Sequence, residues 1–135
     1  MTIAAKEATS LIAFTLPSTR YSAWMARYHV RAALKRHDLY DYADDAATVT
    51  SELAANAIMH AGAPKFDVEV MRLAGLEAIA VIVTDSSPEP PVKRDPAGDT
   101  EHGRGLHIVE ALSSSWGWRP EHPGKAVYAI LTREA

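Results

Sequence analysis

The pattern of apolar and polar residues in the first half of the chain predicts a strand followed by two helices. The apolar run over residues 11–16 predicts a strand, which Pro17 ends. Apolar residues at helical spacing predict an amphipathic helix over residues 21–36 and a second one over about residues 44–60. Residues 41–45 are expected to form the turn and N-cap before the second helix. That helix has one apolar stripe, which consists of Ala46, Val49, Leu53, Ala57 and Ile58.

The second half of the chain reads mainly as strands. Residues 66–73 alternate between apolar and polar, as in a half-buried strand, and the continuous apolar run 78–83 predicts a central strand buried on both faces. A proline-rich loop over residues 86–102 precedes a helix over 105–113 and a hairpin of residues 116–119 and 125–131. The three tryptophans are expected to pack in the core or on the sheet: Trp24, Trp116 and Trp118.

This order of elements predicts an α+β two-layer sandwich, because parallel doubly wound folds alternate strands and helices more strictly. We expect a mixed β-sheet covered on one face by about three helices. Residues 1–10 are predicted to be an N-terminal tail, and residues 11–135 a single domain.

Composition narrows the classes of function. The 135 residues are 47% hydrophobic and 23% charged, which is typical of a globular domain with a real core. The absence of cysteine excludes disulfide scaffolds, thiolate zinc sites and cysteine nucleophiles. A formal net charge of −3 argues against nucleic-acid binding. The sequence shows neither a membrane span nor a signal peptide, so no membrane association and a cytoplasmic location are expected.

Two groups of polar residues are candidates for chemistry. Glu52, Asn56 and His60 are spaced four residues apart, so they share one stripe of the second predicted helix, next to its apolar stripe. A solvated helix face with a terminal histidine is the simpler interpretation. Asp85 directly follows the buried strand, where pockets open and an acid can accept hydrogen bonds from a ligand amino group. The alternative for Asp85 is an Asx-turn.

Further candidates lie before the third helix and on the first one. Gly103, Arg104 and Gly105 precede a helix, where backbone N–H groups can bind an anion, although a simple loop end fits equally well. Neither a dinucleotide fingerprint nor a P-loop is present. Arg27 and Arg31 lie four residues apart and would form either a partner-binding surface or an ordinary solvated face.

Taken together, four segments resemble a known family. They are SELAANAIMH (residues 51–60), VTDSSPEPP (83–91), HGRGLHIVEAL (102–112) and WGWRPEHPGKAVY (116–128). In this order they resemble the Bergerat ATP-binding fold of gyrase, Hsp90, histidine kinases and MutL proteins. The chain is most similar to the small stand-alone branch, which comprises anti-sigma-factor serine kinases and related ATP-binding regulators of actinobacteria.

The resemblance implies a role for each matching residue. Glu52 would be the general base and Asn56 a Mg²⁺ ligand, while Asp85 would accept a hydrogen bond from the adenine amino group. The remaining implied ATP-binding residues are His60, Ser87, Gly103, Arg104, Gly105 and Leu106. The implied function is a serine protein kinase that acts on a STAS-type anti-anti-sigma protein and binds a sigma factor, and the implied oligomer is a homodimer.

Two departures from the family pattern keep a second function open. The first glycine box, usually Asp-x-Gly-x-Gly, is rich in serine and proline here, and prolines remove N–H donors. The last strand often carries a threonine that supports adenine binding, whereas Lys125, Ala126 and Val127 offer no hydroxyl. The alternative is therefore a non-catalytic regulator that senses ATP or binds its partners without nucleotide.

Overall fold

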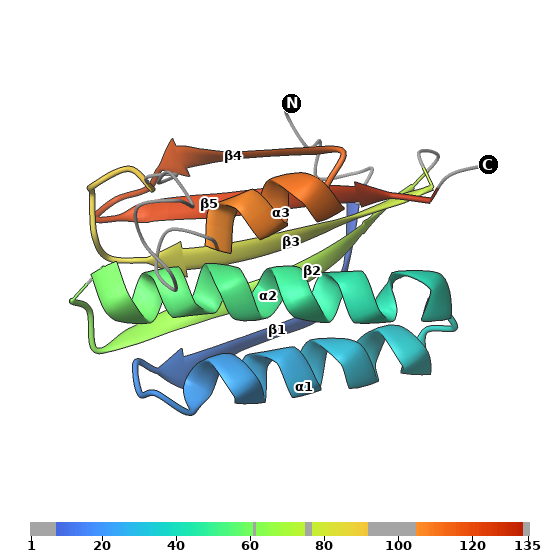
Figure 1. Cartoon of the computed structure of the whole chain (residues 1–135), viewed down its shortest axis with the longest axis horizontal. Helices are drawn as coiled ribbons and strands as arrows, with labels where there is room; N and C mark the ends of the chain where they lie inside the picture. The colour runs from blue at the N-terminus through green and yellow to red at the C-terminus, as the bar shows by residue number, and fades with distance from the viewer. Residues whose placement is uncertain (1–7, 61, 75–76, 92–104, 134–135) are drawn as a thin grey trace.

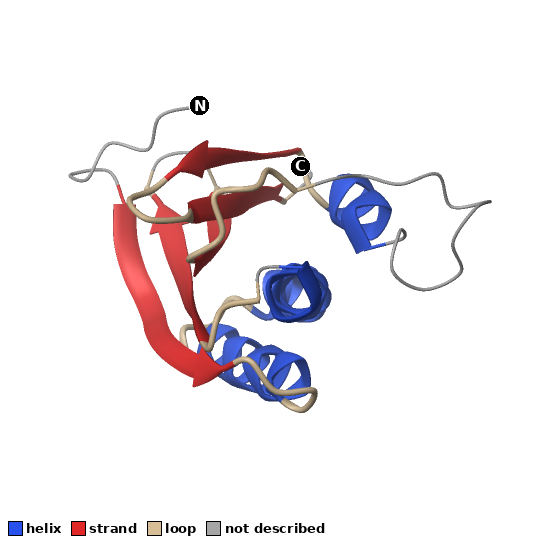
Figure 2. Ribbon diagram, turned by 90° about the vertical axis from the view of Figure 1, so that its left-hand side faces the viewer, coloured by secondary structure: helices blue, strands red, loops and turns tan. Residues whose placement is uncertain are grey.

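A single sheet backs three helices in the part of the chain that the computed structural model describes, residues 8–60, 62–74, 77–91 and 105–133. The helices all lie on one face of the curved sheet (Figures 1 and 2). In chain order the elements are β1 (Ala8–Pro17), α1 (Ser22–Arg36), α2 (Tyr40–His60), β2 (Lys65–Leu73), β3 (Ala78–Asp85), α3 (Gly105–Leu112), β4 (Ser115–Pro120) and β5 (Lys125–Thr132).

The predicted α+β two-layer sandwich is confirmed, with one correction. The strand order is β1-β2-β3-β5-β4, and every neighbouring pair is antiparallel, so the sheet is not mixed. The reason lies in the helix pair between β1 and β2. Because α1 leads the chain away and α2 brings it back, β2 starts beside the end of β1, with Lys65 opposite Pro17.

Two boundaries differ from the sequence prediction. Strand β1 begins at Ala8, so residues 8–10 belong to the sheet rather than to the tail. Helix α2 begins at Tyr40, so residues 41–45 are helical instead of forming a turn. The connection is that short because Asp38 adopts a left-handed conformation, with φ of 59°, and the next N–H, that of Leu39, donates to the carbonyl of Leu34 at 2.8 Å.

The main core lies between α2 and the middle of the sheet. Val49 and Leu53 of α2 belong to one buried cluster with Val81 and Val83 of β3 and Val127 of β5. The alternate residues of β3 (Ala78, Ala80 and Ile82) are buried on the other face of the sheet. The prediction that this strand is buried on both faces is therefore confirmed.

Helix α1 buries a face that is made mostly of small residues. Its buried positions are Ser22, Ala26, Val30, Ala33 and Leu34. The small residues let α1 pack closely on α2 and β1, as Figure 1 shows. Trp24 and Tyr28 are consequently 67% and 60% exposed, so the prediction that Trp24 packs in the core or on the sheet is wrong. Trp118 is also partly exposed, whereas Trp116 packs against the core.

No helix in the described ranges combines the length and the apolar character needed to span a membrane.

Candidate functional site

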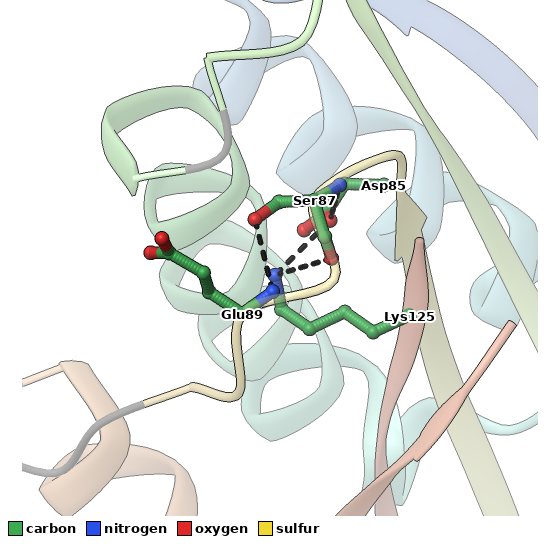
Figure 3. Close-up of polar contacts among 4 residues, drawn as sticks. All are labelled: Asp85, Ser87, Glu89 and Lys125. Atoms are coloured by element: carbon green, nitrogen blue, oxygen red, sulfur yellow. Dashed lines mark hydrogen bonds and ion pairs between the residues drawn. The ribbon is translucent and has the colours of Figure 1, made fainter. Parts of the chain in front are cut away.

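The end of β3 and the start of β5 form a buried polar centre. Asp85, the last residue of β3, lies opposite Lys125, the first residue of β5. The Lys125 ammonium donates to Oδ1 of Asp85 at 3.0 Å, and only 8% and 3% of the two side chains are exposed (Figure 3). Such a buried pair is tolerated because each charge neutralises the other.

The segment after Asp85 is held in place by the same carboxylate. The backbone N–H of Ser87 donates to Oδ1 of Asp85 at 2.9 Å, which is the Asx-turn considered from the sequence. The N–H of Glu89 donates to the hydroxyl of Ser87 at 3.3 Å, and Lys125 donates to the carbonyl of Ser87 at 3.4 Å (Figure 3). These bonds give the serine- and proline-rich segment a defined path without glycines.

Gly124 allows the β4–β5 turn to approach the end of β3. A β-carbon built on Gly124 would lie only 1.8 Å from the carbonyl oxygen of Asp85. Since that atom belongs to the backbone, no side chain fits without a shift of the strand ends. The glycine therefore sets the position of Lys125 beside Asp85.

A cavity of about 130 Å³ opens between α2 and this polar centre. Its apolar wall combines Leu53 and Ala57 of α2 with Val83 and Val127 of the sheet. The polar lining consists of Asn56, Asp85, Ser87, Glu89 and Lys125, and Pro90 and Pro91 close one side. An apolar slot with a few buried polar groups is the usual form of a small-molecule site.

Beside this cavity, Glu52, Asn56 and Gly105 lie together. A β-carbon on Gly105 would be 3.0 Å from Oε2 of Glu52 and 3.6 Å from Oδ1 of Asn56, so the start of α3 rests against both side chains. Burial raises the pKa of Glu52 above its ordinary value, and the nearby Arg27 guanidinium offsets part of that rise. Glu52 thus has the environment of a proton acceptor that works nearer to neutral pH.

Among the described residues, no group of three or more histidines and carboxylates is placed to hold a metal ion. A metal at this site would therefore depend on Asn56, on water and on oxygens brought by a ligand, which is the way Mg²⁺ is commonly held.

The match to a family model now decides the class of protein. The model of the histidine kinase-like ATPase domain matches residues 18–131. The chain belongs to this family. The matched region includes the buried Asp85–Lys125 pair, the cavity beside α2, and Glu52 and Asn56 of α2.

A solved structure shows the same fold. The chain resembles "The crystal structure of the RsbU and RsbW domains of Rv1364c from Mycobacterium tuberculosis", with a TM-score of 0.66 and 22% identity. The alignment covers 92% of this chain and 33% of that one, so the ATPase domain corresponds to about a third of that longer protein. A comparison with curated proteins gave no match.

The structure brings together most of the site residues predicted for the ATPase domain. Asp85 and Ser87 lie at one end of the cavity, Asn56 lines it, and Glu52 and Gly105 lie next to Asn56. Leu106 is 2% exposed and packs in the core. Gly103, Arg104 and the side chain of His60 lie outside the described residues.

The two arginines of α1 differ from each other in their surroundings. Arg31 forms an ion pair with Asp44 of α2, with Nε and Oδ1 3.2 Å apart. Arg27 is half-buried, and its positive charge favours the ionised form of Glu52. They are therefore not an equivalent exposed pair.

Sequence reasoning missed Lys125 and Gly124 as site residues. In the sequence alone, Lys125 only lacks the hydroxyl of the family pattern, because its partner Asp85 lies 40 residues away. The signal was the dipeptide Gly-Lys at the start of the last strand. Its meaning depends on the register between β3 and β5, which no local pattern shows.

Proposed function

We propose that the chain binds ATP with Mg²⁺ in the cavity between α2 and the β3–β5 edge. The observation that carries this proposal is that Asp85 and Asn56 line one cavity, and that Glu52, Asn56 and the start of α3 at Gly105 lie together along a path beside it. The apolar wall of Leu53, Ala57, Val83 and Val127 suits the faces of a purine ring. Asp85 at the buried end would accept a hydrogen bond from the adenine amino group.

The opposite end of the path suits the phosphates. Asn56 would supply an oxygen ligand to Mg²⁺, and phosphate oxygens and water would complete the coordination. The backbone N–H groups at the start of α3 would bind phosphate oxygens, since the N-terminus of a helix attracts anions. Gly105 permits a close approach there.

We further propose that the protein is a serine kinase. The ATP would supply the phosphoryl group. Glu52 would accept the proton of a partner's serine hydroxyl while the serine oxygen bonds to the γ-phosphorus and the bond to the leaving ADP breaks. A glutamate whose pKa is raised by burial is better matched to this task at neutral pH than an exposed one.

Incubation with labelled ATP, Mg²⁺ and candidate STAS-type proteins tests this function. We expect label on a serine of the partner with the wild type, and at least a 100-fold slower transfer with Glu52→Gln. The matched control is Glu69→Gln, because Glu69 is also half-buried but lies on β2, away from the cavity. Equal transfer by wild type and Glu52→Gln would refute the role of Glu52.

The proposed partners are a sigma factor and a STAS-type anti-anti-sigma protein, with α1 as part of the binding surface. Arg27 and Arg31 would contribute positive charge next to the exposed Trp24 and Tyr28. Capture of partners from native cytoplasm with and without ATP would identify them. A sigma factor retained in an ATP-dependent manner is the expected result; retention that ignores ATP would contradict nucleotide coupling.

A non-catalytic regulator is the second candidate. It is favoured by the Asp85 carboxylate, which Lys125 and Ser87 already contact in the protein itself. Calorimetric titration with ATP and Mg²⁺ separates the possibilities. Binding without transfer to any partner supports a sensor, and the absence of binding supports a regulator that needs no nucleotide.

A further inference from the structure

Lys125 is placed where it would contact any base that reaches Asp85. Both residues line the same cavity, next to Ser87, and both are buried. Burying an ammonium group is costly, and a single carboxylate partner compensates only part of its hydrogen-bonding capacity. Because burying the Lys125 ammonium costs free energy, its position at the closed end of a ligand site indicates a role in binding.

Among the described residues, the hydrogen bonds leave one acceptor of Asp85 and one donor of Lys125 unused at this end of the cavity. Oδ1 of Asp85 already accepts from Lys125 at 3.0 Å and from the N–H of Ser87 at 2.9 Å. Its second oxygen, Oδ2, accepts from no group in the described part of the chain, so it can accept from a ligand. The Lys125 ammonium has three donors. It uses one for Asp85 and one, at 3.4 Å, for the carbonyl of Ser87, so one remains.

We propose that Lys125 is a specificity-determining residue, which donates to ring nitrogen N1 of adenine while Oδ2 of Asp85 accepts from the 6-amino group. This inference rests on the proposed ATP binding and adds a second group that reads the base. Adenine presents a donor beside an acceptor on this edge, which complements one free carboxylate oxygen beside one free ammonium hydrogen.

The same hydrogen-bond pattern of Asp85 and Lys125 disfavours the binding of guanine. Guanine offers two adjacent donors, N1–H and the 2-amino group, and these would be satisfied best by both oxygens of a carboxylate. Oδ1 is already filled by Lys125 and Ser87. A guanine base would therefore leave one donor unpaired in a buried place, which costs affinity.

Binding of ATP and of 1-deaza-ATP tests the proposal, because the analogue carries C–H in place of N1. Calorimetric titration in Mg²⁺ should show that the wild type binds ATP at least 10-fold more tightly than 1-deaza-ATP. Lys125→Met keeps the length of the side chain but donates nothing. This variant should bind ATP more weakly and should bind the two nucleotides equally well. GTP should bind more weakly than ATP to the wild type.

A control variant and three contrary outcomes complete the test. Lys35→Met changes an exposed lysine of α1 and should keep the wild-type preference for ATP. Equal binding of ATP and 1-deaza-ATP by the wild type, or tighter ATP binding by Lys125→Met, would overturn the role of Lys125 while leaving ATP binding intact. If the wild type binds neither nucleotide, the proposed function itself fails. The wild-type comparison needs no variant, so it holds even if Lys125→Met unfolds.

Discussion

Glu52 experiences two opposite electrostatic influences. Burial against the start of α3 disfavours its charged form, and Arg27 favours it, with burial the stronger of the two. A carboxyl group with a raised pKa in the folded state stabilises the fold at pH values below its unfolded pKa. That contribution is lost as the pH rises through the folded pKa.

We therefore predict that Glu52→Gln stabilises the protein at neutral pH, by about 0.5 kcal/mol because the half-buried group is partly screened by solvent. Thermal melts at pH 7 and at about pH 3 measure this difference, which should disappear at the lower pH, because the carboxyl group of Glu52 is then protonated in the unfolded state as well as in the folded one. A variant less stable than the wild type at pH 7 would contradict a raised pKa.

Gly124 lies so close to the backbone of Asp85 that no side chain fits there. Gly124→Ala is predicted to cost more than about 3 kcal/mol of unfolding free energy, because the new β-carbon would overlap the backbone of Asp85. Urea unfolding measures it. The control is Gly62→Ala, since Gly62 adopts a positive φ of 64° but has open space around it. Its cost should be about 1 kcal/mol, and equal losses in the two variants would argue against the clash.

A substitution of Gly105 tests the contact between the start of α3 and Glu52 of α2. A β-carbon there would press on Oε2 of Glu52 at 3.0 Å, so that carboxylate must shift by a few tenths of an ångström. Gly105→Ala is predicted to slow phosphoryl transfer about 10-fold or more while changing the free energy of unfolding by less than about 1 kcal/mol. Transfer kinetics and urea unfolding of the same variant check both parts, and unchanged kinetics would show that the contact does not matter for Glu52.

At the scale of elements, α1 has one face that serves the fold and another that faces solvent. Ala26, Val30 and Leu34 pack inside, whereas Trp24 and Tyr28 stack on each other outside, with ring centroids 6.0 Å apart. Large exposed aromatic side chains often mark interaction surfaces. One face of α1 therefore belongs to the core, and the other face belongs to the surface proposed for partner binding.

Trp24→Ala is predicted to change the free energy of unfolding by less than about 0.5 kcal/mol, because the side chain contacts little of the core. Leu34→Ala, on the same helix but fully buried, should cost about 2–5 kcal/mol. Urea unfolding compares the two, and capture experiments should show that Trp24→Ala weakens partner binding. A large loss of stability in Trp24→Ala would mean that Trp24 serves the fold instead.

At the scale of the whole molecule, a ligand held between α2 and two strands should stabilise the entire fold. Binding to the folded state alone contributes about 2.7 kcal/mol when the free ligand is at 100 times its Kd. For a chain of this size that corresponds to a rise in Tm of roughly 8–15 °C. Thermal melts with ATP and Mg²⁺ should show this rise, and chelation of Mg²⁺ should remove much of it. Asp85→Ala should show none, and a shift that survives this variant would place the nucleotide elsewhere.

Much of the molecule followed from local patterns. The apolar stripe of α2, the doubly buried β3 and the hairpin of β4 and β5 all appear in the periodicity of the chain, because each depends on residues close in sequence. The alignment of Glu52 with Asn56 also follows from helical spacing alone. These features needed only the 3.6-residue and two-residue repeats of helix and strand.

Which segments of the chain meet depends on how the whole chain packs. The antiparallel order of the sheet depends on how the α1–α2 pair returns the chain, and the exposure of Trp24 depends on which side of α1 meets α2. The pairing of Asp85 with Lys125 depends on the register between β3 and β5 and on the approach that Gly124 permits. Contacts between residues 40 positions apart arise from packing of the whole chain. For that reason, local sequence patterns indicate the Asp85 carboxylate of the site but not the Lys125 ammonium beside it.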